Sequence, residues 1–185
     1  MDSFCEQIVK RKITKKIIGV KIAVWAITMG LGLLATGLFV YLGFKMEQSL
    51  LFIFAVFAFG AAIYMSIKFS RSLNLEYEYS FTNGCFDIDK ISAKTNRTRL
   101  ITADCKNIEK FGRYKEAEHA NRQYNKTITA YSVITSPDIY YAVIRQPEAG
   151  SVLVIFEPDE NSVEHLGEYM PRHIWMDYKR NENIK

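Results

Sequence analysis

Residues 22–44 of the chain read IAVWAITMGLGLLATGLFVYLGF, and residues 50–67 read LLFIFAVFAFGAAIYMSI. Neither stretch contains a charged residue. A helix rises about 1.5 Å per residue, so the two stretches reach roughly 34 Å and 27 Å, against a hydrocarbon core of about 30 Å. Only the five residues KMEQS connect them. The sequence therefore predicts an antiparallel transmembrane hairpin over residues 22–71.

The distribution of Lys and Arg around the two spans predicts their orientation. Residues 1–21 hold six Lys and Arg residues, and Lys68 and Arg71 follow the second span, whereas the connecting loop holds only Lys45. Cytoplasmic flanks of membrane spans carry the excess of positive charge. We therefore expect a multi-pass protein of the plasma membrane with both termini in the cytoplasm. A cleaved signal peptide is not expected, because a second span follows the first at once.

The basic segment before the first span, residues 1–21, has two interpretations. Phe4, Ile8 and Ile13 are spaced among basic residues, which suits a short interfacial helix lying on anionic headgroups. The same composition is typical of the ordinary positive flank of a first span. We favour the flank.

Small residues recur at every fourth position in both spans. Small side chains at this spacing let helix backbones approach closely in lipid. They predict packing within the hairpin or, as an alternative, a homodimer face. Neither span contains an ionisable residue, which argues against a channel or transporter. The expected packing residues are Thr28, Gly32, Thr36, Ala58, Ala62 and Ser66.

Length and charge limit what the rest of the chain does. The chain has 185 residues and a net charge of +4, but residues 1–71 carry nine Lys and Arg against three acids, and residues 72–185 carry fifteen against seventeen. A nucleic-acid-binding domain would concentrate positive charge on its folded part, so this class is not expected. Three cysteines without a CxxC spacing predict neither a disulfide framework nor a zinc site.

After Arg71 the hydrophobic pattern changes to alternation. Residues 73–81 alternate apolar and polar side chains, and Asn83-Gly84 then predicts a tight β-hairpin. Pro158 with Asp159 suits a helix start, and the apolar spacing of that helix continues up to Pro171. We expect a frayed tail from Tyr178, and either a loop or a short exposed helix over residues 112–126. Further strands are expected near residues 86–90, 97–104, 108–111, 128–135, 140–146 and 151–158.

Six or seven strands closed by one C-terminal helix describe a small barrel or sandwich, the architecture of pleckstrin-homology-like (PH-like) domains. The hairpin, YEYSFTNGCFDIDKI at residues 77–91 and IFEPDENSVEHLGEYMPRHI at residues 155–174 together resemble a family of uncharacterised bacterial membrane proteins. That family pairs a two-span hairpin anchor with a cytoplasmic PH-like domain. The resemblance implies that residues 72–185 form this domain, and it brings no catalytic motif.

No pattern of catalytic or metal-binding residues stands out in the sequence. The three histidines, His119, His165 and His173, form neither HxxxH nor HExxH, and His119 is expected to be solvated. Nucleophile-elbow and phosphate-loop motifs are also missing from the sequence. Asp87 and Asp89 share a strand face, but solvated acids beside a turn are commoner than an acid–base pair. We expect no cofactor, no metal and no enzyme activity.

Four cations gather around the expected turn between the second and third strands: Lys90, Lys94, Arg97 and Arg99. Close to an anionic leaflet they would attract lipid headgroups or an acidic partner segment. Alternatively they balance acids on neighbouring strands. The sequence therefore predicts a membrane-anchored, non-catalytic binding or scaffold module that recruits a protein segment or anionic headgroups. The alternative is a subunit or assembly factor of a larger membrane complex that acts through the hairpin.

Overall fold

The computed structural model describes residues 4–183, which form two compact units. One unit is Ile13–Asn74 and contains the two long helices. The other combines Met1–Lys12 with Leu75–Lys185 and contains all the strands. The β unit is thus discontinuous in sequence, with the helical unit inserted into it. The domain boundary expected at Ser72 leaves out the first part of the β unit.

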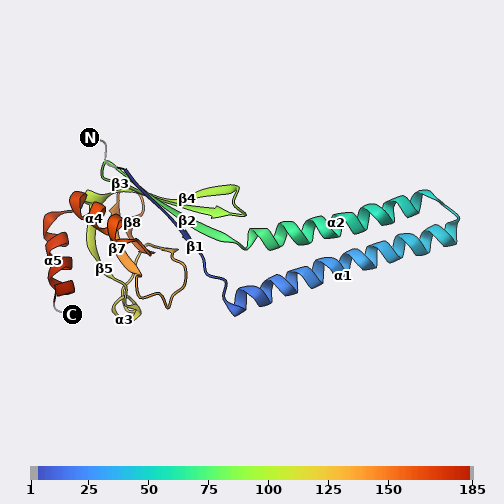
Figure 1. The fold of residues 1–185 in the computed structure, drawn as a ribbon, viewed down its shortest axis with the longest axis horizontal. Helices are drawn as coiled ribbons and strands as arrows, with labels where there is room; N and C mark the ends of the chain where they lie inside the picture. Colours follow the sequence, from blue (N-terminus) through green and yellow to red (C-terminus); the bar gives the residue numbers. More distant parts are fainter. Residues whose placement is uncertain (1–3, 184–185) are drawn as a thin grey trace. The chain divides into compact units, whose positions relative to one another are not determined.

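The helical unit is an antiparallel pair, α1 (Lys15–Met46) and α2 (Leu50–Ser72) (Figure 1). Both are long and apolar enough to cross a membrane, judged by length and composition. α1 begins seven residues before the apolar stretch, so its first two turns carry Lys15, Lys16 and Lys21. Glu47 ends α1 in a left-handed conformation (φ 54°), which turns the chain toward α2.

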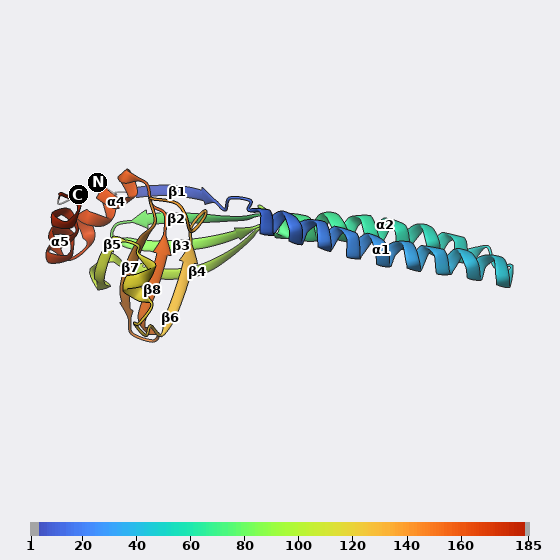
Figure 2. The same ribbon diagram turned by 90° about the horizontal axis from the view of Figure 1, so that it is seen from below.

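The first sheet has the order β1-β2-β3-β4, and all its pairings are antiparallel (Figure 2). Asn83 (φ 49°) and Gly84 (φ 84°) form the turn between β2 and β3, as the Asn-Gly pair predicts. A register shift between Ile88 and Asp89 marks a bulge opposite β4. The four strands are β1 (Phe4–Lys10), β2 (Leu75–Thr82), β3 (Cys85–Ser92) and β4 (Asn96–Asp104).

The strand β1 corrects the expectation for the N-terminal segment, which is neither a charged flank nor an interfacial helix over residues 4–10. Its side chains alternate, with Cys5, Gln7 and Val9 on the inner face and Phe4 and Ile8 exposed. Phe4 and Ile8 are four residues apart, a spacing that fits a helix as well as a strand. The partner strand lies about seventy residues later in the sequence, with Lys10 opposite Glu76, so no local pattern reveals the pairing.

The second sheet has the order β5-β7-β8-β6, in which β6 runs parallel to β8 and the other pairs are antiparallel. A short 3-10 turn, η1 (Cys105–Asn107), leads from the first sheet into the second. The strands are β5 (Ile108–Arg113), β6 (Lys126–Ala130), β7 (Tyr140–Gln146) and β8 (Gly150–Phe156).

The core of the β unit lies between the two sheets. Tyr79 and Phe86 from the first sheet pack their rings against Phe156 of the second. Helix α4 (Glu160–Tyr169) closes the core with Val163 and Leu166, both buried. The Asp159 side chain accepts a hydrogen bond from the Ser162 amide and so caps the helix, as the sequence suggests.

The chain continues into one more helix, α5 (Arg172–Asn183), where we expected a frayed tail from Tyr178. Pro171 separates the two helices, and its carbonyl accepts the first hydrogen bonds of α5, from Ile174 and Trp175. Trp175 packs on Gly167 so closely that a Cβ there would lie 2.6 Å from the indole. Tyr178 is buried against Phe111 of β5. These tertiary contacts order the helix.

Candidate functional site

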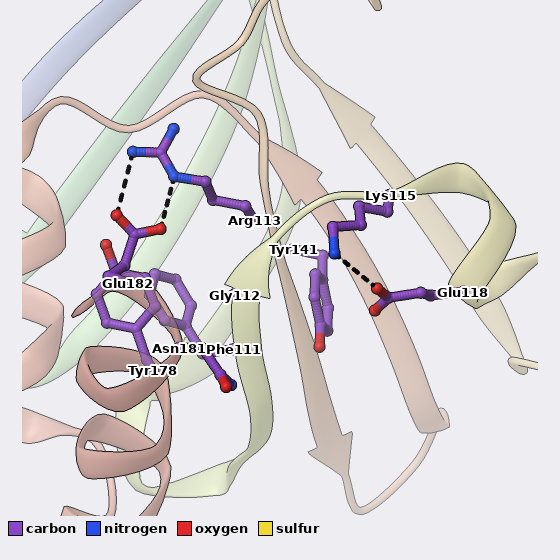
Figure 3. Close-up of a pocket in the computed structure, with 9 residues that line it drawn as sticks. All are labelled: Phe111, Gly112, Arg113, Lys115, Glu118, Tyr141, Tyr178, Asn181 and Glu182. Atoms are coloured by element: carbon purple, nitrogen blue, oxygen red, sulfur yellow. Dashed lines mark hydrogen bonds and ion pairs between the residues drawn. The ribbon is translucent and has the colours of Figure 1, made fainter. Parts of the chain in front are cut away.

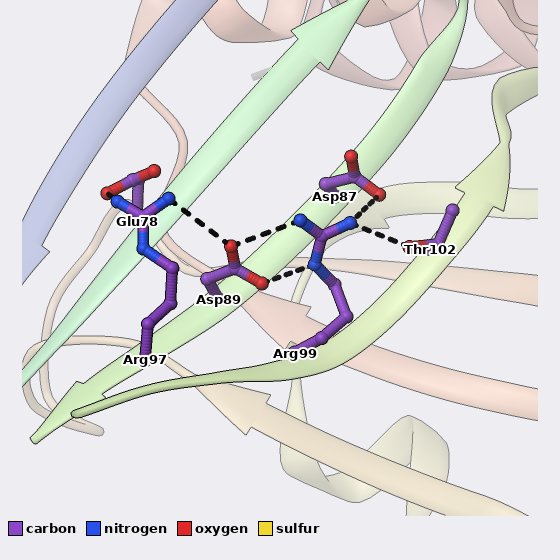
Figure 4. A network of polar contacts seen from close by, with 6 residues as sticks. All are labelled: Glu78, Asp87, Asp89, Arg97, Arg99 and Thr102. Carbon is purple, nitrogen blue, oxygen red and sulfur yellow. Dashed lines mark hydrogen bonds and ion pairs between the residues drawn. The ribbon is translucent and has the colours of Figure 1, made fainter.

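The outer face of the first sheet holds a network of ion pairs (Figure 4). Arg97 bonds Glu78 at 2.5 Å and lies 3.7 Å from Asp89. Arg99 donates two hydrogen bonds to the Asp89 carboxylate, one from Nε and one from Nη2 at 3.2 Å. It also contacts Asp87 at 3.0 Å. The two predicted arginines therefore neutralise carboxylates of neighbouring strands, which was the alternative interpretation of this charge cluster.

The burial of the carboxylates shows what these arginines do. Glu78 and Asp89 are only 6% and 4% exposed, although both lie on the outer face of the sheet. A buried carboxylate without a partner is strongly destabilising, so Arg97 and Arg99 stabilise the sheet. Asp87 and Asp89 are held by Arg99 in the same way, and the geometry does not set them up as an acid–base pair.

The other two predicted cations lie elsewhere. Lys90 is opposite Tyr77 and Thr98, so alternation places it on the sheet face away from Asp89. Lys94 lies in the turn after β3 with φ 63° and is exposed. Within residues 4–183 neither lysine forms an ion pair. The four cations thus do not form one patch.

A cleft opens between the edge strand β5 and the helix α5 (Figure 3). Its volume is about 290 Å³, at the lower end of the range of ligand sites. We call it the β5–α5 cleft. Its lining residues are Phe111, Gly112, Arg113, Lys115, Glu118, Tyr141, Tyr178, Asn181 and Glu182.

Arg113 is the central charged group of the β5–α5 cleft. Its Nε donates to Glu182 of α5 at 2.7 Å, and its Nη2 lies 3.4 Å from the other oxygen of the same carboxylate. Asp138 lies 3.3 Å away, and the guanidinium stacks over the Tyr140 ring at 5.2 Å. The hydrogen bond with Glu182 raises the pKa of Arg113. The guanidinium therefore stays charged and holds a carboxylate in the cleft.

The rest of the cleft suits an extended chain. Three consecutive residues of β5 line it, and β5 has a neighbour on one side only. Gly112 has no side chain to cover the backbone, and Tyr141 stands beside it. A second ion pair, Lys115 with Glu118 at 3.2 Å, bounds the cleft on the side of α3 (Glu116–His119). An edge strand beside apolar rings and a carboxylate-binding arginine can accept a peptide strand.

The segment between β5 and β6 covers the outer face of the second sheet, and the expectation of a solvated His119 is wrong. His119 is 7% exposed, stacks on Tyr114 and meets Tyr141 edge-on at 4.3 Å. Its Nδ1 lies 2.8 Å from the Tyr124 hydroxyl, while Nε2 is buried without a hydrogen-bond partner in the described structure. Burial, aided by Arg122, lowers the pKa of His119. The sequence signal that we overlooked is the pair of tyrosines, Tyr114 and Tyr124, in this otherwise polar stretch, which indicates that part of it is buried.

In the hairpin, the structure brings together residues from both expected stripes. Thr28 Oγ1 lies 2.6 Å from Ser66 Oγ. Gly32 faces Ala62 so closely that a Cβ on the glycine would overlap the alanine Cβ. Thr36 lies 3.5 Å from the carbonyl of Ala55, and Ala58 is half-buried with its carbonyl near Gly32.

Comparison with protein-family models shows which family this chain belongs to. A family model described as bacterial PH-like domain (DUF6106) matches residues 1–176. The chain belongs to this family. Searches of curated proteins and of solved structures gave no match. The family match covers the helical insertion together with both sheets, and it confirms the predicted resemblance and fold class.

Side chains that could bind a metal do not cluster in the described part of the PH-like domain. Among residues 4–183, no group of three or more His, Cys, Asp or Glu side chains could hold a metal ion. His165 of α4 packs near Phe81 and Tyr169, whereas His173 of α5 is exposed. The feature of the described domain that suits molecular recognition is the β5–α5 cleft.

Proposed function

We propose that this protein is a membrane-anchored, non-catalytic binding module that holds its PH-like domain at the inner face of the plasma membrane. The observation that carries the proposal is the insertion of the apolar hairpin between two paired strands. Lys10 at the end of β1 lies opposite Glu76 near the start of β2. The domain is thus tied to both helices, through residues 11–14 and 73–74. Two short links restrict the domain more than a single flexible linker would.

The charges flanking the hairpin support a multi-pass topology with both termini in the cytoplasm. A test uses thiol labelling of intact cells with a membrane-impermeant maleimide. A cysteine at Gln48, between α1 and α2, is expected to react from outside, whereas the exposed Cys85 of the domain is expected to react only after permeabilisation. Labelling of Cys85 in intact cells would overturn the orientation.

The β5–α5 cleft supports recruitment of a protein segment. An extended peptide with an acidic side chain would pair along β5 and compete with Glu182 for Arg113. Anionic headgroups remain a second ligand class for the cations of the domain, of which Lys90 and Lys94 are free of ion pairs within residues 4–183. Arg97 and Arg99 are already held by carboxylates.

The alternative function, assembly into a larger complex through the hairpin, has weaker support. The residues expected to form a contact surface face one another across α1 and α2, as Thr28 with Ser66 and Gly32 with Ala62 show. A partner helix or a second copy would therefore have to use other residues of the hairpin.

Photo-crosslinking in native membranes tests the proposal on the full chain. Benzoylphenylalanine at Asn181, in the cleft, is expected to give a discrete protein adduct that Arg113→Ala weakens. The matched control is Met176, which is exposed on the same helix but does not line the cleft. Equal adducts from both positions, or adducts only from a probe at Ala58 in the hairpin, would reject recruitment at the cleft. An adduct with lipid would favour anionic headgroups over a protein segment as the ligand.

A further inference from the structure

A tight turn in the loop between β6 and β7 presents one exposed isoleucine. The Ser136 amide donates to the carbonyl of Val133 at 3.0 Å, which closes a turn over residues 133–136. Ile134 lies within this turn and is 55% exposed. A single exposed isoleucine is ordinary on a protein surface, so its meaning depends on how the turn is built and what lies beside it.

Glu157, the residue after β8, holds this turn from both ends. One carboxylate oxygen accepts the Ser132 amide at 2.8 Å, and the other accepts the Ser136 hydroxyl at 2.5 Å. These hydrogen bonds, together with Lys12, lower the pKa of Glu157 although burial opposes its ionisation. The Glu157 carboxylate therefore stays ionised and is bonded within the loop, and the turn keeps Ile134 on the surface in a defined conformation.

The turn lies beside the chain segment that leads to the hairpin. The Lys12 amide donates to the Ser132 carbonyl at 3.0 Å, and the Arg11 amide donates to the Leu75 carbonyl at 3.0 Å. Lys10, Arg11 and Lys12 are all exposed. The helix α1 begins only three residues after Lys12. An exposed apolar tip and three cations thus lie in the β unit, and the cations come shortly before α1 in sequence.

Three acids lie near this arrangement. Glu157 interacts with the charge of Lys12, which lowers the Glu157 pKa, while its two oxygens accept hydrogen bonds from Ser132 and Ser136. Asp138 follows the turn, but it contacts the Arg113 guanidinium at 3.3 Å. Glu76 lies opposite Lys10 on β2. Arg11 and Lys12 form no ion pair within residues 4–183.

We propose that the Ile134 turn is a membrane-contacting element, in which Ile134 enters the interfacial layer of an anionic leaflet while Arg11 and Lys12 meet lipid headgroups. The inference rests on the proposed membrane anchoring and names the surface with which the domain touches lipid. An apolar side chain beside cations matches the chemistry of an anionic bilayer surface. Contact would give the PH-like domain one defined face toward the membrane.

Spin labels on the full chain in nanodiscs test the proposal. The background carries Cys5→Ser and Cys85→Ser, while Cys105 stays because it is 2% exposed and burial raises the pKa of its thiol to about 12, so it reacts slowly. Single cysteines then replace Ile134 or Met176, which is 53% exposed and serves as the matched control. The measurement is accessibility to oxygen and to a water-soluble nickel complex.

In nanodiscs of phosphatidylcholine with phosphatidylglycerol, the Ile134 label is expected to gain oxygen access severalfold over the Met176 label and to lose access to nickel. The double variant Arg11→Glu with Lys12→Glu is expected to abolish the gain in oxygen access and to restore access to nickel. In nanodiscs of pure phosphatidylcholine, the gain in oxygen access is expected to be smaller. A label at Ile134 as water-accessible as that at Met176 would overturn the proposal. The proposal would also be overturned if the Ile134 label were immobilised without a gain in oxygen access, because that result would indicate contact with protein.

A third label separates this proposal from the anchoring on which it rests. Phe57 of α2 is 71% exposed, so a label there reports directly on lipid around the hairpin. If the Phe57 label is in lipid and the Ile134 label is not, only the turn proposal fails. If neither label is in lipid, the anchoring itself fails.

Discussion

The helices of the hairpin meet at Gly32 and Ala62, where no room is left for another carbon, whereas the β unit fills its core with Tyr79, Phe86 and Phe156. Lipid offers little hydrophobic drive for helices to associate, so they pack through small residues and close backbone approach. The β unit is stabilised by removing large rings from water. Larger side chains at the helix contact should therefore destabilise the hairpin, and smaller side chains in the core should destabilise the β unit.

The largest effect on stability is expected when the β unit is produced without the hairpin, either with or without β1. Joining residues 1–12 to 75–185 through Asn-Gly should give a soluble, folded domain, because β1 and β2 already pair as neighbours. A fragment starting at Ser72 lacks β1 and should lose cooperative unfolding. Circular dichroism during thermal unfolding measures both. Equal stability of the two fragments would show that β1 is dispensable.

Loss of volume in the domain core is the next test. Phe156 is fully buried among Tyr79, Phe86 and Phe111, so Phe156→Ala should lower the free energy of unfolding by about 3–5 kcal/mol. Urea unfolding of the joined domain measures it. Phe4→Ala, at a side chain 62% exposed, is the control and should change stability by less than about 0.5 kcal/mol.

Added volume in the hairpin gives a smaller effect. Gly32→Leu should lower hairpin stability in mixed micelles by about 1–3 kcal/mol, because its side chain collides with Ala62. Gly37→Leu on the same helix is the matched control, since a Cβ there has no neighbour within 4 Å. Titration with sodium dodecyl sulfate measures both variants. Equal effects at the two glycines would mean that the helices do not meet at Gly32.

The smallest effect concerns a charge that packing has placed inside the domain. The pKa of Glu157 lies below its usual value, so its ionised form adds stability above the unfolded pKa of about 4.3, and that stability is lost as pH falls through the lower folded pKa. Glu157→Gln should cost about 1 kcal/mol at pH 7 and almost nothing in strong acid. Urea unfolding across pH measures the difference. A pH-independent cost would contradict the role of the charge.

Local signals in the sequence predict several elements of this chain. Asn83-Gly84 produces the expected turn because both residues tolerate positive φ. The spacing of Val163 and Leu166 produces α4, and both side chains are buried. Each of these signals lies within a few residues of the structure that it specifies.

Other elements could not be predicted because their partners are distant in sequence. β1 pairs with a strand on the far side of the hairpin, and α5 is held by Phe111 and Gly167. Arg97 and Arg99 belong to a charge-rich stretch in sequence, but the sheet register places them over Glu78 and Asp89. His119 is buried because tyrosines from three parts of the chain meet around it.

By itself, the sequence determined that this chain has two apolar helices, a hairpin of alternating strands and a closing amphipathic helix. These features follow from residue periodicity and turn chemistry, which act over short distances along the chain. Only the tertiary structure decided that the helices are inserted inside the β unit, that β5 and α5 enclose a cleft, and that Glu157 fixes the turn that contains Ile134. Each of these depends on residues that are remote in sequence, and burial selects such contacts only when the whole domain is packed.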